Sequence, residues 1–360
     1  MKKMFLLFAL FCVVSCKLLP GKLTKLPDNL RIVQKSDSII LATNSSQTLS
    51  VQYLGCGGLY LLKDSTGILI DPFFSSQKIP ALVRSTLGNK RKIASDPKMV
   101  QFGLNALYNQ DPRFTQHIKS IFVAHSHYDH LLDVPAVWKA LKEKPEVYLN
   151  ESGSNVCNGV IESGKMTLLE DYETTYNCIG RPVMVGKKVR VYPILAAHNP
   201  HTNHIKFFDG SLTSPLVYFN DPFDKTKAND WLEGKTFSFL IDYLDDQDQI
   251  QLRLFVQSSS CNPTAGIPPA DLLKERPVDI AFLCVASYES SPFYPEVVIT
   301  KTQPKKIVWI HWEDFFRDYD KSPRTVRATD VPGFFEKEMV RNNLGKSCMP
   351  WPRTILEIRY

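Results

Sequence analysis

The feature that most constrains this chain is a dense cluster of histidines in one short segment. His125, His127, Asp129 and His130 fall within six consecutive residues, directly after the apolar run Ile118–Ala124. The apolar run predicts a buried strand, and the segment after it therefore predicts a loop at a sheet edge, where open α/β sheets place their sites. Three imidazoles and a carboxylate are costly to bury without a partner, and a divalent metal such as zinc binds both kinds of group. We therefore predict a metal centre, with His125 and His127 on one ion and Asp129 and His130 on a second.

Further ligands are expected from distant parts of the chain, at the ends of two later apolar runs. His198 follows the strand predicted from Lys188, and His311 follows the predicted strand Lys306–Ile310. Histidines at strand ends can point into the same rim as the first cluster. Two more histidines follow closely, His201 and His204. We prefer His198 as the ligand because it comes first after the strand.

Strand-like and helix-like segments alternate through most of the chain, which predicts an α/β fold with sheets covered by helices. The predicted strands are Leu49–Leu54, Leu59–Lys63, Ile68–Ile70, Ile118–Ala124, Glu146–Leu149, Lys188–Leu195, Phe237–Tyr243, Gln251–Gln257, Val278–Val285, Lys306–Ile310 and Thr354–Arg359. One helix is expected to begin at an Asp133 cap and run through Leu141, and another to cover Val331–Asn342. Residues 75–118 contain helical stretches such as Ile79–Leu87 and predict a helical insertion, either a lid or pocket wall or a passive excursion.

The N-terminus has the pattern of an export signal. Two lysines precede the apolar run Met4–Val14, which is shorter than the roughly 20 apolar residues that cross a bilayer. The ending Val13-Val14-Ser15-Cys16 resembles a bacterial lipobox, in which Cys16 becomes the lipidated first residue; an ordinary cleaved signal is the alternative. We expect a signal peptide over 1–15, a lipidated tether over 16–48 that leads into the fold, and anchoring to a bacterial envelope membrane.

The other cysteines and the charge add weaker constraints. Six cysteines follow the expected signal and anchor: Cys56, Cys157, Cys178, Cys261, Cys284 and Cys348. Export permits disulfides, so Cys157 and Cys178 can pair; the alternative is that most of the six are small buried apolar side chains. The formal net charge of +6 is mild and no dense Lys/Arg stripe is visible, so a small-molecule substrate is expected rather than a nucleic acid.

The His-x-His-x-Asp-His pattern, preceded by a glycine-containing strand pair that ends in Ile70-Asp71-Pro72, resembles the metallo-β-lactamase superfamily. The resemblance implies a four-layer αβ/βα sandwich of two mixed sheets over residues 49–360, with metals at one edge. It implies one or two zinc ions, with manganese or iron as alternatives. The implied ligand sets are His125, His127 and His198 for the first ion, and Asp129, His130 and His311 for the second. Asp71 would orient the site loop without binding metal.

One position departs from the pattern of that superfamily. Its members with two metals usually carry a bridging aspartate after a late strand, whereas the comparable strand here ends in Ser258-Ser259-Ser260-Cys261. We expect Ser258 to stand where the bridge would be. A neutral hydroxyl compensates the repulsion between two divalent cations less well than a carboxylate does. The second ion is therefore expected to bind weakly, or the two ions to be bridged by hydroxide alone. A catalytically inactive descendant is the remaining alternative. Cys261 is a soft donor nearby and a less favoured compensating ligand.

These features predict a metal-dependent hydrolase that uses zinc-activated water on a small ester, lactone or phosphodiester. Asp129 would be the catalytic residue that holds and orients the water. Aromatic side chains near the motif loops favour an organic or lipid-like substrate: Tyr128, Trp138, Trp231, Trp312 and Phe315-Phe316. The arrangement is most similar to the lactonase and phospholipase-D-like branch of the superfamily. The alternatives are a ligand-binding envelope lipoprotein that lost turnover through Ser258, and a structural lipoprotein whose metal only holds the loops.

Overall fold

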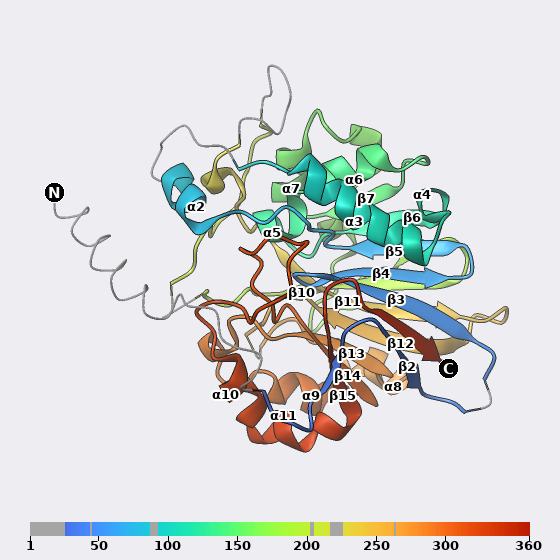
Figure 1. Cartoon of the computed structure of the whole chain (residues 1–360). Coiled ribbons are helices and arrows are strands. Elements are labelled where there is room, and N and C mark those ends of the chain that lie inside the picture. The colour runs from blue at the N-terminus through green and yellow to red at the C-terminus, as the bar shows by residue number, and fades with distance from the viewer. Residues whose placement is uncertain (1–25, 44, 87–92, 202–204, 217–225, 263) are drawn as a thin grey trace.

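Two stacked eight-stranded sheets form the centre of the part of the chain that the computed structural model describes (Figure 1). That part comprises residues 26–43, 45–86, 93–201, 205–216, 226–262 and 264–360. The first sheet has the order β1 (Arg31–Val33), β15 (Ser347–Pro350), β14 (Lys306–Ile310), β13 (Ile280–Cys284), β12 (Ile250–Gln257), β11 (Thr236–Leu244), β10 (Val189–Ala196) and β9 (Val183–Val185). The second has the order β2 (Ser36–Ile40), β16 (Ile355–Arg359), β3 (Thr48–Gly55), β4 (Gly58–Lys63), β5 (Thr66–Ile70), β6 (Ile118–Phe122), β7 (Glu146–Leu149) and β8 (Met166–Leu168).

Helices cover the outer face of each sheet. Those on the side of the second sheet are α2 (Ile79–Thr86), α3 (Pro97–Gln110), α4 (Phe114–His117), α5 (Tyr128–Leu131), α6 (Val134–Ala140) and α7 (Glu151–Cys157). Those on the side of the first sheet are α8 (Ala270–Glu275), α9 (Glu296–Thr302), α10 (Val331–Glu336) and α11 (Glu338–Asn342). Short 3-10 helices occupy Ser163–Lys165, Leu169–Tyr172, Ala228–Asp230, Tyr288–Ser290 and Leu344–Lys346.

Alternating apolar side chains explain why the sheets are covered on both faces. On β11, Phe237, Phe239 and Ile241 pack between the two sheets, whereas Leu240 packs into the core under the outer helices. Successive side chains of a strand point to opposite faces, so a strand that is apolar at both positions needs a layer on each side. The αβ/βα sandwich predicted from the sequence is thereby confirmed.

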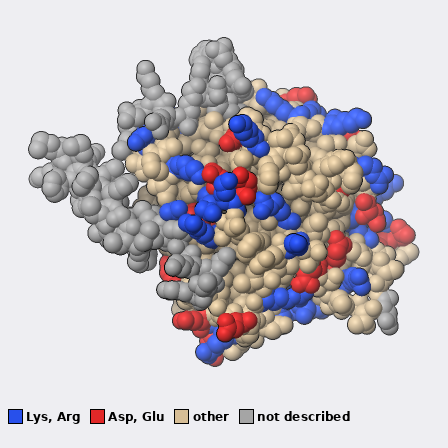
Figure 2. Space-filling view, in the orientation of Figure 1, with Lys and Arg blue, Asp and Glu red and all other residues tan. Residues whose placement is uncertain are grey.

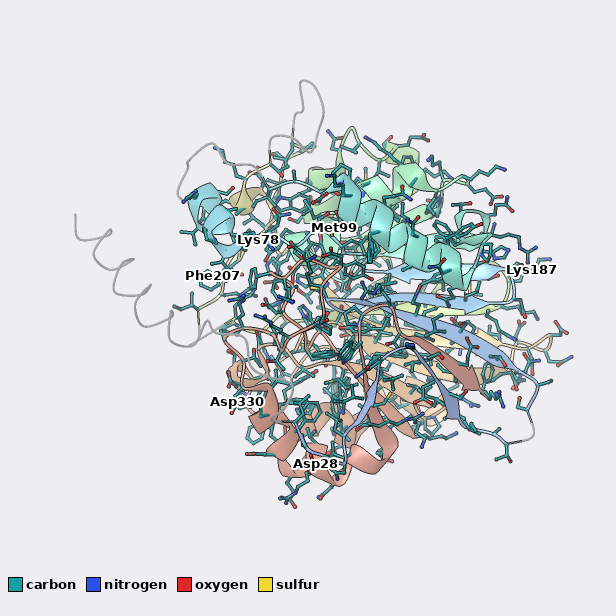
Figure 3. The ribbon with its side chains drawn as sticks, viewed as in Figure 1. Asp28, Lys78, Met99, Lys187, Phe207 and Asp330 are labelled. Carbon is teal, nitrogen blue, oxygen red and sulfur yellow. The ribbon has the colours of Figure 1, made fainter. Side chains whose placement is uncertain are left out.

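The direction of the strands brings the carboxyl ends of several strands of both sheets to the same side of the molecule. Strands β3, β5 and β6 run parallel to one another in their sheet, and β10, β12 and β14 do so in the other. Their carboxyl ends therefore lie along one edge of each sheet. Figure 3 labels Lys78 and Phe207 on this side of the molecule, and Lys187, in the turn between β9 and β10, at the opposite end.

Several expectations require correction. Strands β1 and β2 lie within the expected tether over 16–48 and extend both sheets, so the fold begins before residue 49. They are short edge strands with few buried residues, which leaves little apolar pattern to detect. Strand β15 was not expected either. The helix expected over Val331–Asn342 is divided at Lys337, whose backbone is extended (φ −55°, ψ 135°) and whose ammonium pairs with Glu296.

The considered disulfide is absent from the structure, whereas the expected lipid anchor lies outside the residues that the structure describes. The six described cysteines are all free, so the considered Cys157–Cys178 disulfide is not formed; Cys157 is buried and Cys178 is exposed. Cys16 and the expected signal peptide lie outside the described residues. Over the described parts of the chain, no helix has the length and apolar character needed to cross a membrane.

Asp133 has a different role from the helix cap that was expected. It precedes α6, but its carboxylate makes no capping hydrogen bond. Instead, Oδ2 accepts from the backbone amides of Phe74 at 2.6 Å and Ser75 at 2.7 Å, and Oδ1 accepts from the hydroxyls of Ser75 and Ser95 at 2.7 and 2.5 Å. The fully buried carboxylate therefore ties the helical insertion to α6, next to the strand ends that carry the site.

We predict that Asp133→Ala destabilises the fold strongly. Removal of the carboxylate leaves two buried amides and two hydroxyls without their acceptor, which should cost about 3 kcal/mol or more. Urea denaturation measures the free energy of unfolding. Asp271→Ala is the matched control, because Asp271 is exposed and paired only with exposed Lys274, and such surface changes stay within about 0.5 kcal/mol. Equal effects of the two substitutions would contradict this role of Asp133.

Candidate metal centre

Seven potential ligands meet at the shared sheet edge in two adjacent groups. The first group is His125, His127 and His198, and the second is Cys56, Asp129, His130 and His311. The ligand atoms within each group lie within 4.8 Å of one another. The rings of His125 and His130, one from each group, are 4.1 Å apart. The structure thus brings together all six predicted ligands, in the predicted division, and adds Cys56.

Each ligand is presented by the end of a strand. His125 and His127 follow β6, and the single helical turn α5 then carries Asp129 and His130. The distant ligands come from three other strand ends: His198 after β10, His311 after β14, and Cys56 in the turn between β3 and β4. Because these strands end at the same edge, residues far apart in the sequence reach one small volume.

The second group is arranged around one carboxylate oxygen. Oδ2 of Asp129 lies 3.5 Å from Sγ of Cys56, 3.5 Å from Nε2 of His311 and 3.7 Å from Nε2 of His130. Sγ of Cys56 is also 3.4 Å from Nε2 of His311. All four side chains are buried, so the group is shielded from bulk water.

The first group is a compact set of imidazoles. Nε2 of His125 is 2.9 Å from Nδ1 of His127, and the His198 ring lies 4.8 and 4.9 Å from these two rings. His201, an alternative in the sequence, lies outside this group but packs against it, with its ring centroid 4.8 Å from that of His198. His204 lies outside the described residues.

Asp71 connects the metal groups to both sheets. Its Oδ1 accepts the backbone amide of Ala124 at 2.8 Å, and its Oδ2 faces Nδ1 of His130 at 2.9 Å. The same Oδ2 accepts the hydroxyl of Ser258, at the end of β12, at 2.7 Å. When Nδ1 of His130 donates to Asp71, its Nε2 is left as the acceptor atom that can bind a metal. Asp71 therefore occupies the orienting position that the resemblance implied.

Electrostatics keep the first group in its metal-binding form. Burial lowers the pKa of His125, His127 and His198, and the neighbouring imidazoles lower it further, to about 3 for His127. At neutral pH these rings are neutral, and neutral imidazole is the form that binds metals. For His130, burial lowers the pKa, but the carboxylates of Asp71 and Asp129 outweigh it and raise the pKa.

Asp129 and Cys56 respond oppositely to the same surroundings. Burial raises the pKa of Asp129, but His130 and His311 outweigh it and hold the pKa below its usual range. Burial, followed by the charges of Asp129 and Glu313, raises the pKa of the Cys56 thiol. Without a cation the group thus pairs an ionised carboxylate with a protonated thiol. Neutral imidazoles, a carboxylate and a cysteine are the donors that zinc takes in proteins, so the residues present fit a metal centre.

Cys56 is the residue that the sequence reasoning missed. The Gly55-Cys56-Gly57-Gly58 segment lies between two predicted strands, and in the structure it forms a turn that directs the cysteine into the site. The available signal was a cysteine enclosed by glycines in a strand turn. Cys261, the less favoured compensating ligand, does not join the groups: its sulfur accepts the backbone amide of Ala197 at 3.1 Å.

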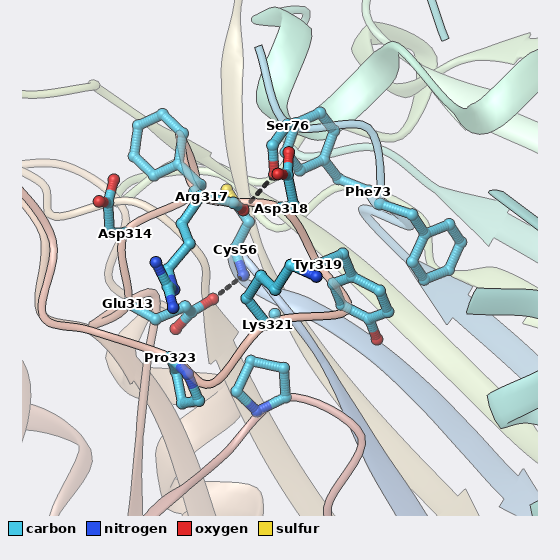
Figure 4. Close-up of a pocket in the computed structure, with 14 residues that line it drawn as sticks. Cys56, Phe73, Ser76, Glu313, Asp314, Arg317, Asp318, Tyr319, Lys321 and Pro323 are labelled. Carbon is cyan, nitrogen blue, oxygen red and sulfur yellow. Dashed lines mark hydrogen bonds between the residues drawn. The ribbon is translucent and has the colours of Figure 1, made fainter. Parts of the chain in front are cut away.

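The aromatic rim expected around the site is smaller than predicted. Trp138, Trp231 and Trp312 are buried in the packed cores, so they form no surface for a substrate. Phe315 does lie beside the centre, with its ring 5.3 Å from that of His311. It lines a pocket that opens next to Cys56 (Figure 4). The other lining residues include Phe73, Ser76, Glu313, Arg317, Tyr319 and Lys321.

No family model matches the sequence, and no curated protein matches it. Similar solved structures include Igni18, a metallo hydrolase from Ignicoccus hospitalis KIN4/I, at 13% identity and a TM-score of 0.48, covering 87% of this chain and 99% of that one. YhfI, a metallo-β-lactamase-fold protein from Bacillus subtilis, has 8% identity and a TM-score of 0.47, covering 87% and 100%. CmlA, a diiron β-hydroxylase from Streptomyces venezuelae, has 12% identity and a TM-score of 0.44, covering 88% and 55%. These similarities concern the fold, whereas the metal centre rests on the side chains of this chain.

We predict that Asp71→Asn weakens metal binding at the second group. An amide nitrogen facing Nδ1 of His130 favours the tautomer with hydrogen on Nε2, which cannot bind a metal. Loss of such a partner typically lowers metal affinity 10–100-fold. Titration against a competing chelator measures the affinity of each ion. Asp64→Asn is the control, because Asp64 is exposed and has the same unusual positive φ, 53° against 42° for Asp71. If both variants keep the affinity of the wild type, Asp71 does not orient His130.

Proposed function

We propose that this protein is a metal-dependent hydrolase of a small ester, lactone or phosphodiester, with zinc as its resident metal. The observation that carries the proposal is the convergence of histidine, aspartate and cysteine ligands from both sheets into two touching groups. Structural metal sites are closed by four ligands, whereas catalytic sites keep a position open. The first group has three histidines and thus leaves such a position.

Bound metal ions would supply Lewis acidity that activates water and polarises the substrate oxygen. Asp129 contributes a carboxylate that stays ionised, because His130 and His311 lower its pKa. An ionised carboxylate orients an attacking water by accepting its hydrogen bond, whereas its low pKa makes it a weak base. Asp71 keeps His130 in the required tautomer. Burial of these groups excludes competing water and strengthens their electrostatic effects.

The pocket beside Cys56 supports a small organic substrate. Phe73 and Phe315 provide apolar walls, and the same pocket is lined by two basic side chains, Arg317 and Lys321, and three acidic ones, Glu313, Asp314 and Asp318. On the face shown in Figure 2, basic and acidic side chains are interspersed, which favours a small ligand over a nucleic acid. The apolar walls suit an ester, lactone or phosphodiester with an apolar substituent.

A second candidate function is binding of a ligand without turnover. The specific observation in its favour is Ser258, whose hydroxyl donates to Asp71, and which was expected to stand in place of the bridging aspartate of the superfamily that the sequence resembles. A centre with less negative charge compensates two cations less well. The two candidates differ in whether the metal-loaded protein releases product.

We predict that the zinc-loaded protein hydrolyses at least one member of a panel of aryl esters, aliphatic lactones and aryl phosphodiesters. Asp129→Ala should lower kcat/KM about 10²–10⁴-fold, because the attacking water loses the carboxylate that accepts its hydrogen bond. Product release followed by absorbance measures the rate, and Asp271→Ala is the control with unchanged activity. Binding of two ions without turnover of any panel member would favour the ligand-binding alternative.

We further propose that Cys16 anchors the mature chain to a bacterial envelope membrane. Support comes from the lipobox-like ending of the apolar leader. With the full chain expressed in a bacterium, Cys16→Ala should abolish incorporation of labelled palmitate and shift the protein from the membrane to the soluble fraction. Cys12→Ala, within the same leader, should leave both unchanged. Continued lipid labelling of the Cys16 variant would contradict the anchor.

A further inference from the structure

Cys56 lies in a turn whose backbone is costly for any residue other than glycine. Gly55, Cys56 and Gly57 have consecutive positive φ angles of 96°, 49° and 81°. Non-glycine residues in this region cost of order 1–3 kcal/mol and persist where the surrounding structure holds them. The turn also cannot accept bulk at its next residue, because a Cβ on Gly57 would lie 2.6 Å from Cβ of Ser258. Cys56 thus keeps a strained backbone conformation in this turn, and its sulfur reaches the site.

Two further residues hold Cys56 and His311 relative to each other. The carboxylate of Glu313 accepts the backbone amide of Cys56 and, at 2.6 Å, the hydroxyl of Tyr53. The Tyr53 oxygen in turn accepts the backbone amide of His311 at 2.8 Å. Burial, followed by the charge of Glu313, raises the pKa of Tyr53, so it remains a donor. This buried chain of hydrogen bonds therefore positions two members of the second group together. Figure 4 shows one of its bonds, between Glu313 and Cys56.

Four of the six donor–donor separations in the second group are close to the edges of a tetrahedron around a metal. Zinc bonds of about 2.3 Å to sulfur and about 2.0–2.1 Å to nitrogen or oxygen place the donor atoms about 3.3–3.6 Å apart. The observed separations are 3.4 Å for Cys56–His311, 3.5 Å for Cys56–Asp129, 3.5 Å for His311–Asp129 and 3.7 Å for His130–Asp129. Cys56 thus lies at the distances from Asp129 and His311 that a ligand of the same ion would have.

Charge gives a second reason for sulfur in this position. Asp129 is the only carboxylate among the seven ligands of the two groups, and Ser258 adds none. A thiolate at Cys56 would return the negative charge that a bridging aspartate would otherwise supply.

We propose that Cys56 is a metal ligand, and that its thiolate completes a Cys-Asp-His-His site with Asp129, His130 and His311. The inference rests on the metal centre of the proposed function. When the sulfur–metal bond forms, the S–H bond breaks and its proton passes to the buffer, with no oxidation or reduction. A thiolate favours zinc, cobalt or iron at this ion over magnesium or manganese. The negative charge that Cys261 was considered to supply would thus come from Cys56 in the β3–β4 turn instead.

Reconstitution of the full chain with cobalt(II) tests the proposal. The wild type should bind two ions and show a thiolate-to-cobalt charge-transfer absorption in the near ultraviolet. Cys56→Ser should lose that absorption and lower the affinity of the second ion more than about 100-fold, beyond the loss typical of an outer partner. Cys261→Ser is the matched control, since Cys261 is also buried and close to the site but outside both groups, and it should retain both properties.

X-ray absorption of the zinc-loaded wild type provides a measurement that does not depend on folding of the variant. A sulfur neighbour at about 2.3 Å from zinc is expected, at about half an atom per zinc when both ions are bound. Absence of this sulfur, or charge-transfer absorption that survives in Cys56→Ser, would overturn the ligand. Hydrolysis distinguishes the two proposals: cobalt–thiolate absorption without turnover refutes the proposed function alone, and turnover without a sulfur ligand refutes Cys56 alone.

Discussion

The buried carboxylate of Asp71 is the interaction on which the arrangement of the site depends. It comes directly after β5, and it accepts hydrogen bonds from the amide that follows β6, from His130 and from Ser258 at the end of β12. Ser258 belongs to the other sheet, so one side chain connects both sheets with the metal groups. Its positive φ of 42° turns the chain away from the strand at this point. A carboxylate that satisfies three donors at once makes the geometry of the edge depend on the strand ends rather than on flexible loops.

The charge balance of the centre follows from this geometry. The structure places neutral imidazoles around the first position and a carboxylate with a thiol around the second. Burial favours neutral forms, so Asp129 remains ionised only because His130 and His311 stabilise its charge. Two bound divalent cations would favour the charged form of the thiol, which would then lose its proton. The same enclosed environment that raises the pKa of Cys56 without metal makes its thiolate a strong partner once a cation is present.

The sequence allowed much of the fold and the histidine ligands to be predicted, because each left a local pattern. The strands before His125 and His311 are largely apolar, and the spacing of His125, His127, Asp129 and His130 points to metal chemistry. Cys56 left no such pattern, since its role depends on a turn in one sheet meeting a strand end in the other. Strands β1 and β2 are edge strands with little apolar content. Asp133 preceded a helix as a cap does, but the insertion at Phe74 and Ser75 provided better donors.

The hydrogen bonds of Tyr53 and Glu313 show that residues from both sheets position the second group. Tyr53 lies on β3, two residues before the turn begins to bend, and Glu313 follows His311 after β14. Their hydrogen bond therefore joins the strand that presents the sulfur to the strand that presents the last histidine. Movement between the sheets would separate Cys56 from His311 and open the tetrahedron. Packing of the apolar faces between the sheets thus fixes the geometry of the second group as well as the fold, together with the hydrogen bonds of Asp71 to Ser258 and of Tyr53 to Glu313, which cross between the sheets.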